Sequence, residues 1–185
     1  MILDKASRLI TEQLKNGRKA NLTFICTHNS RRSHLAQVWA QAAAHHFALP
    51  DVHTFSGGTE TTACNIRTVR AMRRAGHSIA TLSEGDNPKY LVQFSENAQP
   101  LACYSKRYNS PENPAEDYVA MMCCADVSEK CPVVTGATSK VALHYLDPKI
   151  ADDTPQEAER YDERCRQIAE EMFYLMAQVK SQLSK

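Results

Sequence analysis

Short apolar runs alternate with helical patterns through the first half of the chain, and this alternation limits the fold more than any other feature. Residues 20–26 and 52–56 form two apolar runs, and helical patterns at residues 33–47 and 66–75 follow them after short links. Strand, helix, strand and helix in this order predict a parallel sheet in an α/β fold. We therefore expect one parallel sheet with helices on both of its faces.

The second half of the chain is expected to extend this sheet. Apolar runs at residues 101–104, 118–124 and 141–146 predict further strands, so the sheet is expected to have four to five of them. Residues 90–94 are interpreted as a short helix. Residues 109–117 are rich in turn-forming side chains and predict a surface loop.

Amphipathic helices are expected at both ends of the chain. Residues 3–16 carry apolar side chains at helical spacing, which predicts an extra N-terminal helix within an extension at residues 1–17. Near the other end, Thr154-Pro155-Gln156-Glu157 has the N-cap, the proline and the glutamate that typically begin a helix. The length suits one domain, residues 1–185, with its core at residues 20–180. The apolar face of the last helix is expected to contain Tyr161, Cys165, Ile168, Met172, Leu175 and Val179.

The composition excludes several classes of protein. The net charge is +1, which gives no reason to expect a nucleic acid or a membrane surface as partner. No apolar run approaches the roughly 20 residues of a membrane span, and the first residues lack the pattern of a signal peptide. We therefore expect a cytoplasmic monomer. The seven cysteines contain no Cys-x-x-Cys pair, which argues against a disulfide framework or a zinc site. We predict no metal and no bound cofactor.

The stretch from Cys26 to Ser33 contains the first candidate site. Cys26 ends a predicted strand, and Arg32 and Ser33 stand where the next helix begins. Backbone N–H groups at a helix start attract anions, and the same positive field favours the thiolate of a cysteine. The planar guanidinium of Arg32 suits two oxygens of a tetrahedral oxyanion. Ser33 is expected to donate a hydrogen bond to the thiolate, and Asn29 to adopt a left-handed turn. The other residues of this expected oxyanion-binding loop are Thr27, His28, Ser30 and Arg31.

Two further candidates, Cys124 and Asp147, also stand at the ends of predicted strands. Because ligands of parallel sheets bind at the carboxyl ends of the strands, we expect these side chains near Cys26. Asp147 is expected to protonate the leaving oxygen as a general acid. The alternative for Asp147-Pro148 is an ordinary turn. Gly57-Gly58, after the second strand, leaves room for a close backbone approach at the same edge of the sheet.

These residues together resemble a known family. Residues 26–33, Cys-Thr-His-Asn-Ser-Arg-Arg-Ser, are similar to the active-site loop of low-molecular-weight protein tyrosine phosphatases and of the arsenate reductases that share their fold. Residues 55–59, 65–79 and 144–148 resemble other segments of this family. The resemblance runs from about residue 20 to residue 180 and leaves out the N-terminal helix and the surface loop.

Residues 118–132 favour the reductase branch of the family. They resemble the redox segment of thioredoxin-coupled arsenate reductases, in which two cysteines stand seven positions apart and a proline follows the second. Cys124 and Cys131-Pro132 match this spacing. The phosphatases tend to place aromatic residues after the Asp-Pro pair, whereas Lys149-Ile150 follow it here.

The resemblance implies a cysteine relay. Cys26 attacks arsenate held by Arg32 and the loop, while Asp147 assists the loss of water. Cys124 then attacks Cys26, which releases arsenite, and Cys131 attacks Cys124. The resulting Cys124–Cys131 disulfide is reduced by thioredoxin or another thiol reductant.

Four residues depart from the family pattern or complicate it. His28 replaces a usual glycine, and is expected either to adopt a left-handed conformation or to contact the oxyanion. Arg31 replaces a frequent cysteine, and is expected either to sharpen oxyanion selectivity or to face solvent. Gln37 stands where some reductases have the glutamate that holds a potassium ion, so no such ion is predicted. Cys123 is a second candidate for the relay thiol, although its spacing to Cys131 is less suitable than that of Cys124.

Two other functions remain open from the sequence. The chain is alternatively a phosphatase that hydrolyses phosphotyrosine or small phosphate esters, with Cys124 and Cys131 protecting Cys26 from oxidation. A third possibility is a binding or redox-sensing module that uses the loop without turnover. Asp147 argues against this third reading, because oxyanion binding alone needs no general acid.

Overall fold

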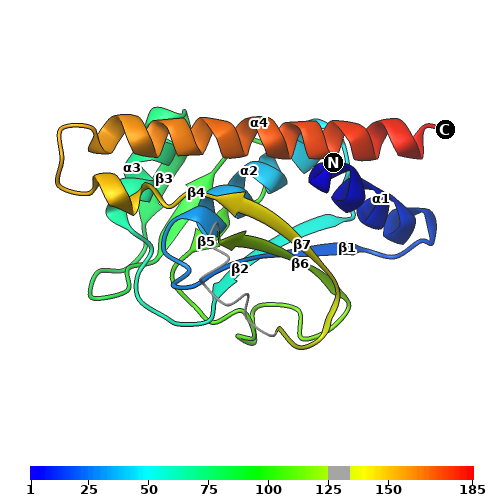
Figure 1. Cartoon of the computed structure of the whole chain (residues 1–185), viewed down its shortest axis with the longest axis horizontal. Helices are drawn as coiled ribbons and strands as arrows, with labels where there is room; N and C mark the ends of the chain where they lie inside the picture. The colour runs from blue at the N-terminus through cyan, green and yellow to red at the C-terminus, as the bar shows by residue number, and fades with distance from the viewer. Residues whose placement is uncertain (125–133) are drawn as a thin grey trace.

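A computed structural model describes residues 1–124 and 134–185 (Figure 1). Its centre is a sheet of four strands: β1 (Ala20–Cys26), β2 (Val52–Gly58), β6 (Tyr118–Cys124) and β7 (Ala137–Tyr145). The order across the sheet is β2-β1-β6-β7, and every neighbouring pair is parallel. This confirms the predicted α/β fold with a parallel sheet.

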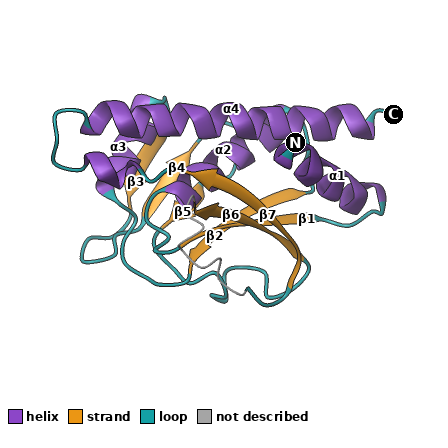
Figure 2. Cartoon of the chain, in the orientation of Figure 1, coloured by secondary structure: helices purple, strands orange, loops and turns teal. Residues whose placement is uncertain are grey.

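Helices cover one face of this sheet. Figure 2 shows α1 (Ile2–Lys15), α2 (Arg32–His46) and α4 (Glu157–Leu183) on the same side. Their apolar side chains meet those of alternate strand residues, such as Phe24 and Met121, in the main core. The predicted face of α4 is buried along its whole length, and α1 is the expected N-terminal helix. None of the helices within residues 1–124 and 134–185 combines the length and apolar character that crossing a membrane requires.

The other face of the sheet differs in detail from the expectation of helices on both faces. Ile25, Tyr118 and Met122 form a smaller apolar cluster there, and Tyr108 from a loop packs against it. Gly57 allows this approach, because a Cβ atom at that position would lie 2.2 Å from Cα of Tyr108. A turn-rich loop therefore takes the place of a helix in the described part of this face.

A second, antiparallel sheet was not expected. It contains β3 (Ser78–Thr81), β4 (Tyr90–Gln93) and β5 (Leu101–Cys103), with β4 in the middle. The helix predicted at residues 90–94 is therefore wrong, and the strand predicted at residues 101–104 belongs to this sheet and not to the parallel one. Tyr90 and Val92 are buried while their neighbours are half-buried, so burial here follows the two-residue period of a strand.

The start of the last helix was also predicted too early. Thr154 does not cap α4, because its hydroxyl donates a hydrogen bond of 2.8 Å to the carbonyl of Ala151. Ala151 ends a short 3-10 helix, η1 (Pro148–Ala151), and α4 begins only at Glu157. The helix α3 (Ile66–Arg74) packs against α4 from the side of the second sheet.

Candidate active site

Cys26 lies at the carboxyl end of β1, where the chain turns through residues 27–31 into α2. From this strand the sheet continues to β2 on one side and to β6 on the other. Ligands of open α/β sheets bind at such a point, because the connections leave the sheet in opposite directions. Cys26 is 4% exposed. The loop therefore stands where the fold itself favours a binding site.

Three side chains fix the shape of the loop. Asn29 adopts a left-handed conformation with φ of 46°, as expected. Its Nδ2 donates a 2.9 Å hydrogen bond to Oγ of Ser33, and Oγ of Ser33 lies 3.1 Å from Sγ of Cys26. Because the serine oxygen already accepts from Asn29, its own hydrogen is available for the sulfur. Ser33 is therefore placed to donate a hydrogen bond to the sulfur of Cys26, as expected.

A second set of contacts supports the loop from outside. The backbone N–H of Lys106 donates to Oδ1 of Asn29 at 3.0 Å, and the hydroxyl of Ser105 donates to the carbonyl of His28 at 2.8 Å.

Gly58 permits the close approach expected of it, because a Cβ atom there would lie 2.6 Å from the carbonyl oxygen of Thr27. The backbone N–H of Asn65 donates to the carbonyl of Ser30 at 2.9 Å, which ties the loop to the start of α3.

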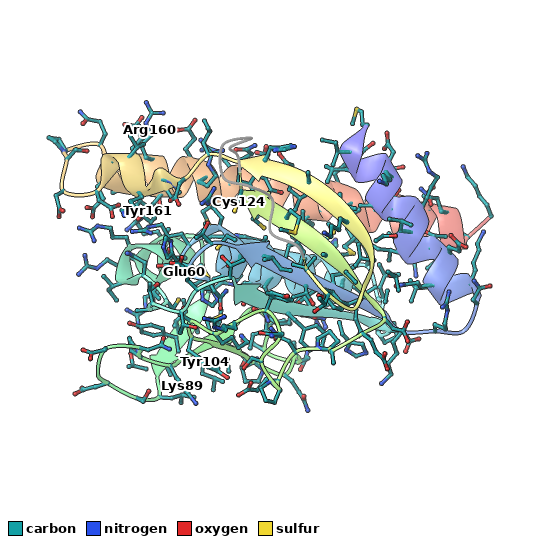
Figure 3. All side chains as sticks on the ribbon, turned by 60° about the horizontal axis from the view of Figure 1, so that its bottom comes forward. Glu60, Lys89, Tyr104, Cys124, Arg160 and Tyr161 are labelled. Atoms are coloured by element: carbon teal, nitrogen blue, oxygen red, sulfur yellow. The ribbon has the colours of Figure 1, made fainter. Side chains whose placement is uncertain are left out.

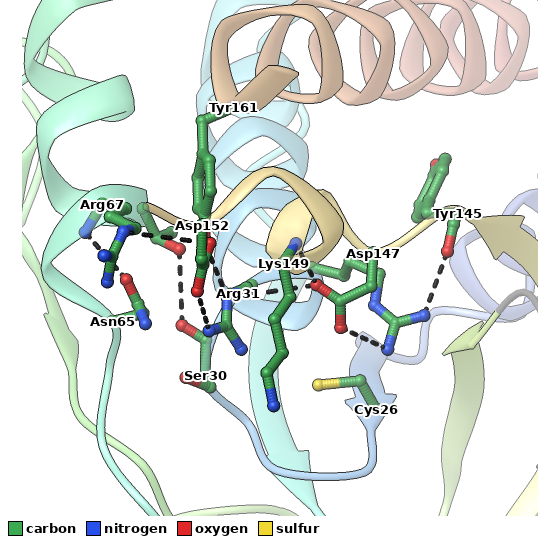
Figure 4. A network of polar contacts seen from close by, with 12 residues as sticks. Cys26, Ser30, Arg31, Asn65, Arg67, Tyr145, Asp147, Lys149, Asp152 and Tyr161 are labelled. Carbon is green, nitrogen blue, oxygen red and sulfur yellow. Dashed lines mark hydrogen bonds and ion pairs between the residues drawn. The ribbon is translucent and has the colours of Figure 1, made fainter. Parts of the chain in front are cut away.

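Arg32 begins α2 but extends toward the ends of β6 and β7. Its Nη1 donates to the carbonyl of Tyr145 at 3.0 Å, and its Nη2 lies 2.9 Å from Oδ2 of Asp147. Asp147 also caps η1, since its Oδ1 accepts a 3.0 Å hydrogen bond from the backbone N–H of Lys149. Asp147 therefore opens a turn, as one interpretation predicts, and also lies beside Arg32, while its role as general acid stays a prediction. Figure 4 shows Asp147 beside Cys26.

Cys124 reaches the loop from the end of β6, next to Tyr145 on β7. Its Sγ lies 3.8 Å from Oγ1 of Thr27, and its side chain is half-buried (Figure 3). Cys123 is fully buried in the main core, and burial raises the pKa of its thiol well above the ordinary value. A buried thiol of this kind is a poor nucleophile. Cys131 lies outside the described residues.

The structure rules out one of the two alternatives for each of His28 and Arg31. His28 does not adopt a positive φ, and its Nε2 lies 3.2 Å from Oε2 of Glu60 on the exposed surface. Arg31 is 11% exposed, so it does not face solvent. Its Nε donates to the phenol of Tyr161 at 2.7 Å, and its Nη2 to Oδ2 of Asp152 at 3.0 Å. Arg31 therefore points toward η1 and α4.

Little in the sequence indicates which residues support the site. Tyr161 stood on the apolar stripe of the last helix, and nothing distinguished Asp152, Ser105 or Lys106 from surface residues. Within the described residues, no group of three potential ligands is arranged to hold a metal ion. The described site brings together two thiols, Cys26 and Cys124, on adjacent strands.

No protein-family model matches the chain, but individual proteins do. An arsenate reductase from Bacillus licheniformis is 26% identical over 148 residues, which cover 80% of this chain and 88% of that protein. An arsenate reductase from Staphylococcus aureus is 30% identical over 97 residues, which cover 52% of this chain and 70% of that protein.

Solved structures give the same fold. The structure of an arsenate reductase from Archaeoglobus fulgidus matches with a TM-score of 0.57 at 17% identity, over 84% of this chain and 98% of that one. A low-molecular-weight protein tyrosine phosphatase from Bacillus subtilis matches with a TM-score of 0.56 at 16% identity, over 87% of this chain and 97% of that one.

The chain belongs to the superfamily of arsenate reductases and low-molecular-weight tyrosine phosphatases. It is an enzyme of this superfamily, and an oxyanion is the class of substrate consistent with its site.

Proposed function

We propose that this enzyme reduces arsenate to arsenite through a relay of cysteine thiols. The observation that carries the proposal is the contact of 3.8 Å between Sγ of Cys124 and Oγ1 of Thr27, the residue after the nucleophile. A second thiol at this place is suited to attack Cys26 directly, and hydrolysis of a phosphate ester needs no such group.

The first step is an attack of the Cys26 thiolate on the arsenic atom of bound arsenate. A sulfur–arsenic bond forms, and one arsenic–oxygen bond breaks. The oxygen leaves as water after it receives a proton from Asp147, which acts as the general acid. Arg32 holds two of the remaining oxygens with its planar guanidinium, and the loop amides hold the third. The hydrogen bond from Ser33 keeps Cys26 ready as a thiolate.

The second step reduces the arsenic. The thiolate of Cys124 attacks Sγ of Cys26, and the electron pair of the sulfur–arsenic bond passes to arsenic, which leaves as arsenite. A Cys26–Cys124 disulfide remains, so two thiols have supplied the two electrons. Cys131 then attacks Cys124 and frees Cys26. We propose that thioredoxin, or another dithiol reductant, reduces the Cys124–Cys131 disulfide in the reducing environment of the cytoplasm.

A phosphatase is the second candidate, and one observation favours it. Leu146 and Ile150, on either side of Asp147, are 66% and 89% exposed. Apolar side chains next to the general acid would suit the organic part of a phosphate ester, whereas arsenate has no such part. Water would then hydrolyse a phosphocysteine on Cys26, and Cys124 would serve to protect that thiol from oxidation.

Replacing one thiol separates the two candidates. Wild type, Cys124→Ser and Cys165→Ser are assayed for arsenate turnover with thioredoxin, thioredoxin reductase and NADPH, and for hydrolysis of an aryl phosphate. The proposal predicts that Cys124→Ser loses arsenate turnover and keeps most of its ester hydrolysis. Cys165→Ser, on α4, is the matched control and should retain both activities, because serine can still accept the hydrogen bond from Trp39. Wild type that hydrolyses the ester but does not turn over arsenate would instead identify a phosphatase.

A further inference from the structure

Two consecutive arginines hold the two ends of the short helix η1. Asp147 precedes η1 and pairs with Arg32, at 2.9 Å between Oδ2 and Nη2. Asp152 follows η1 and pairs with Arg31, at 3.0 Å between Oδ2 and Nη2. Figure 4 shows Asp147 and Asp152 on the same segment, with Arg31 beside Asp152. The position of Asp147 is thus fixed from both ends of a single helical turn.

The Arg31–Asp152 pair is part of a closed triangle with Tyr161 from α4. The phenol of Tyr161 donates to Oδ1 of Asp152 at 2.7 Å, while Nε of Arg31 donates to the phenol oxygen at 2.7 Å. Burial, and then the hydrogen bond to Asp152, raise the pKa of Tyr161, so the phenol keeps the proton that it donates. Because Arg31 and Asp152 are mostly buried, solvent screens their interaction less than it screens a surface pair.

Arg67 extends the triangle to α3. Its Nε lies 3.8 Å from Oδ1 of Asp152 and 2.6 Å from Oε2 of Glu157, at the start of α4. Its Nη2 lies 2.6 Å from Oδ1 of Asp153. The end of η1 at Asp152 is therefore tied to α2 through Arg31, to α3 through Arg67 and to α4 through Tyr161.

These contacts matter because Arg32 has two tasks. In this structure it contacts Asp147, and in the proposed reaction it binds the oxyanion. When its guanidinium turns to the substrate, Asp147 loses part of what holds it. Arg31 does not need to move, because it binds Asp152 and Tyr161 and not the substrate. Its Nε also lies 3.9 Å from Oδ1 of Asp147.

We propose that Arg31 is a positioning residue for the general acid: through Asp152 and Tyr161 it keeps Asp147 beside the reacting oxygen while Arg32 binds the substrate. This inference rests on the proposed function, because it assumes that Asp147 donates the proton to the leaving group. The role is indirect, since Arg31 would contact neither the substrate nor Cys26.

The dependence of the rate on the leaving group tests this role. A phenolate is a poor leaving group and needs the proton of the general acid, whereas a dinitrophenolate leaves without it. Release of the phenol from phenyl phosphate and from a dinitrophenyl phosphate is measured for wild type and for Arg31→Met. We expect kcat/KM of Arg31→Met to fall by about 100-fold for phenyl phosphate and by less than about threefold for the dinitrophenyl ester.

Further variants separate positioning from general loss of structure. Tyr161→Phe removes one hydroxyl and keeps the ring, and it should show the same selective loss to a smaller extent, even if Arg31→Met does not fold. Arg74→Met breaks an exposed ion pair with Asp162 between α3 and α4, and should match wild type with both esters. Equal losses with both esters in Arg31→Met and Tyr161→Phe, or no loss, would overturn the inference and leave the proposed function intact. Wild type that releases no phenol from either ester would refute the proposed covalent step, and the inference with it.

Discussion

The guanidinium of Arg32 lies 2.9 Å from the carboxylate of Asp147. Arg32 begins α2, whereas Asp147 follows β7 and precedes η1. The parallel sheet brings them together, because β1 and β7 end at the same edge. The contact joins the group expected to bind the oxyanion with the group expected to protonate it.

Asp147→Asn should remove the proton donor without disturbing η1. The asparagine oxygen can still accept the hydrogen bond from the backbone N–H of Lys149, so the cap of the short helix is kept. We expect kcat for arsenate reduction to fall by about 100-fold or more, with the midpoint of thermal unfolding nearly unchanged. Steady-state kinetics and a thermal melt measure the two effects. Activity equal to that of wild type would remove Asp147 from the mechanism.

Asn29→Ala should destabilise the fold and distort the loop. Alanine at a φ of 46° is strained, and the change leaves the buried backbone N–H of Lys106 without its acceptor. Together these effects should lower the free energy of unfolding by about 2–4 kcal/mol. Asn29→Gly tolerates the same φ but loses the same hydrogen bonds, so it should be less destabilised. Denaturant titrations of both variants provide the comparison, and equal losses would exclude the backbone contribution.

His34 should make the enzyme less stable in acid. It is fully buried beneath the loop, with Nδ1 3.3 Å from Oγ of Ser56, and burial, with the charge of Lys106, lowers its pKa to about 3. The unfolded chain takes up a proton near pH 6.5 while the folded chain does not. The free energy of unfolding is therefore highest above about pH 6.5 and falls as the pH drops toward 3, by at most about 1.4 kcal/mol per pH unit.

Denaturant unfolding at a series of pH values measures this loss. Between pH 6 and pH 4, the slope of the free energy of unfolding against pH should be smaller in His34→Gln than in wild type. The difference should correspond to the uptake of about one proton on unfolding. His45→Gln changes an exposed histidine on the same helix and should keep the slope of wild type. An unchanged slope in His34→Gln would show that His34 is not the group responsible.

The parallel sheet and the members of the site were predictable because they depend on local patterns. The apolar runs that became β1 and β6 have the same bounds in the structure as in the prediction. Cys26, Cys124 and Asp147 stand at strand ends, and a parallel sheet gathers such ends whatever their separation in sequence. The site could therefore be assembled before the structure was known.

The parts that failed depend on partners distant in sequence. Four residues in β4 are too few to distinguish a strand from a helix, and only pairing with β3 and β5 settles it. Arg31 could be placed only once Asp152 and Tyr161 were seen beside it. A left-handed conformation was one of two expectations for His28, and within this loop Asn29, of which it was also expected, is the residue that adopts it.

A single turnover tests the cysteine relay. The reduced enzyme is mixed with one equivalent of arsenate without any reductant, and its disulfides are mapped by mass spectrometry while arsenite is quantified. The relay predicts one arsenite per chain and a Cys124–Cys131 disulfide, with a Cys26–Cys124 disulfide accumulating in Cys131→Ser. A disulfide at Cys123 formed together with arsenite would contradict the relay. The relay would also be contradicted if no arsenite formed and six or more thiols stayed reduced.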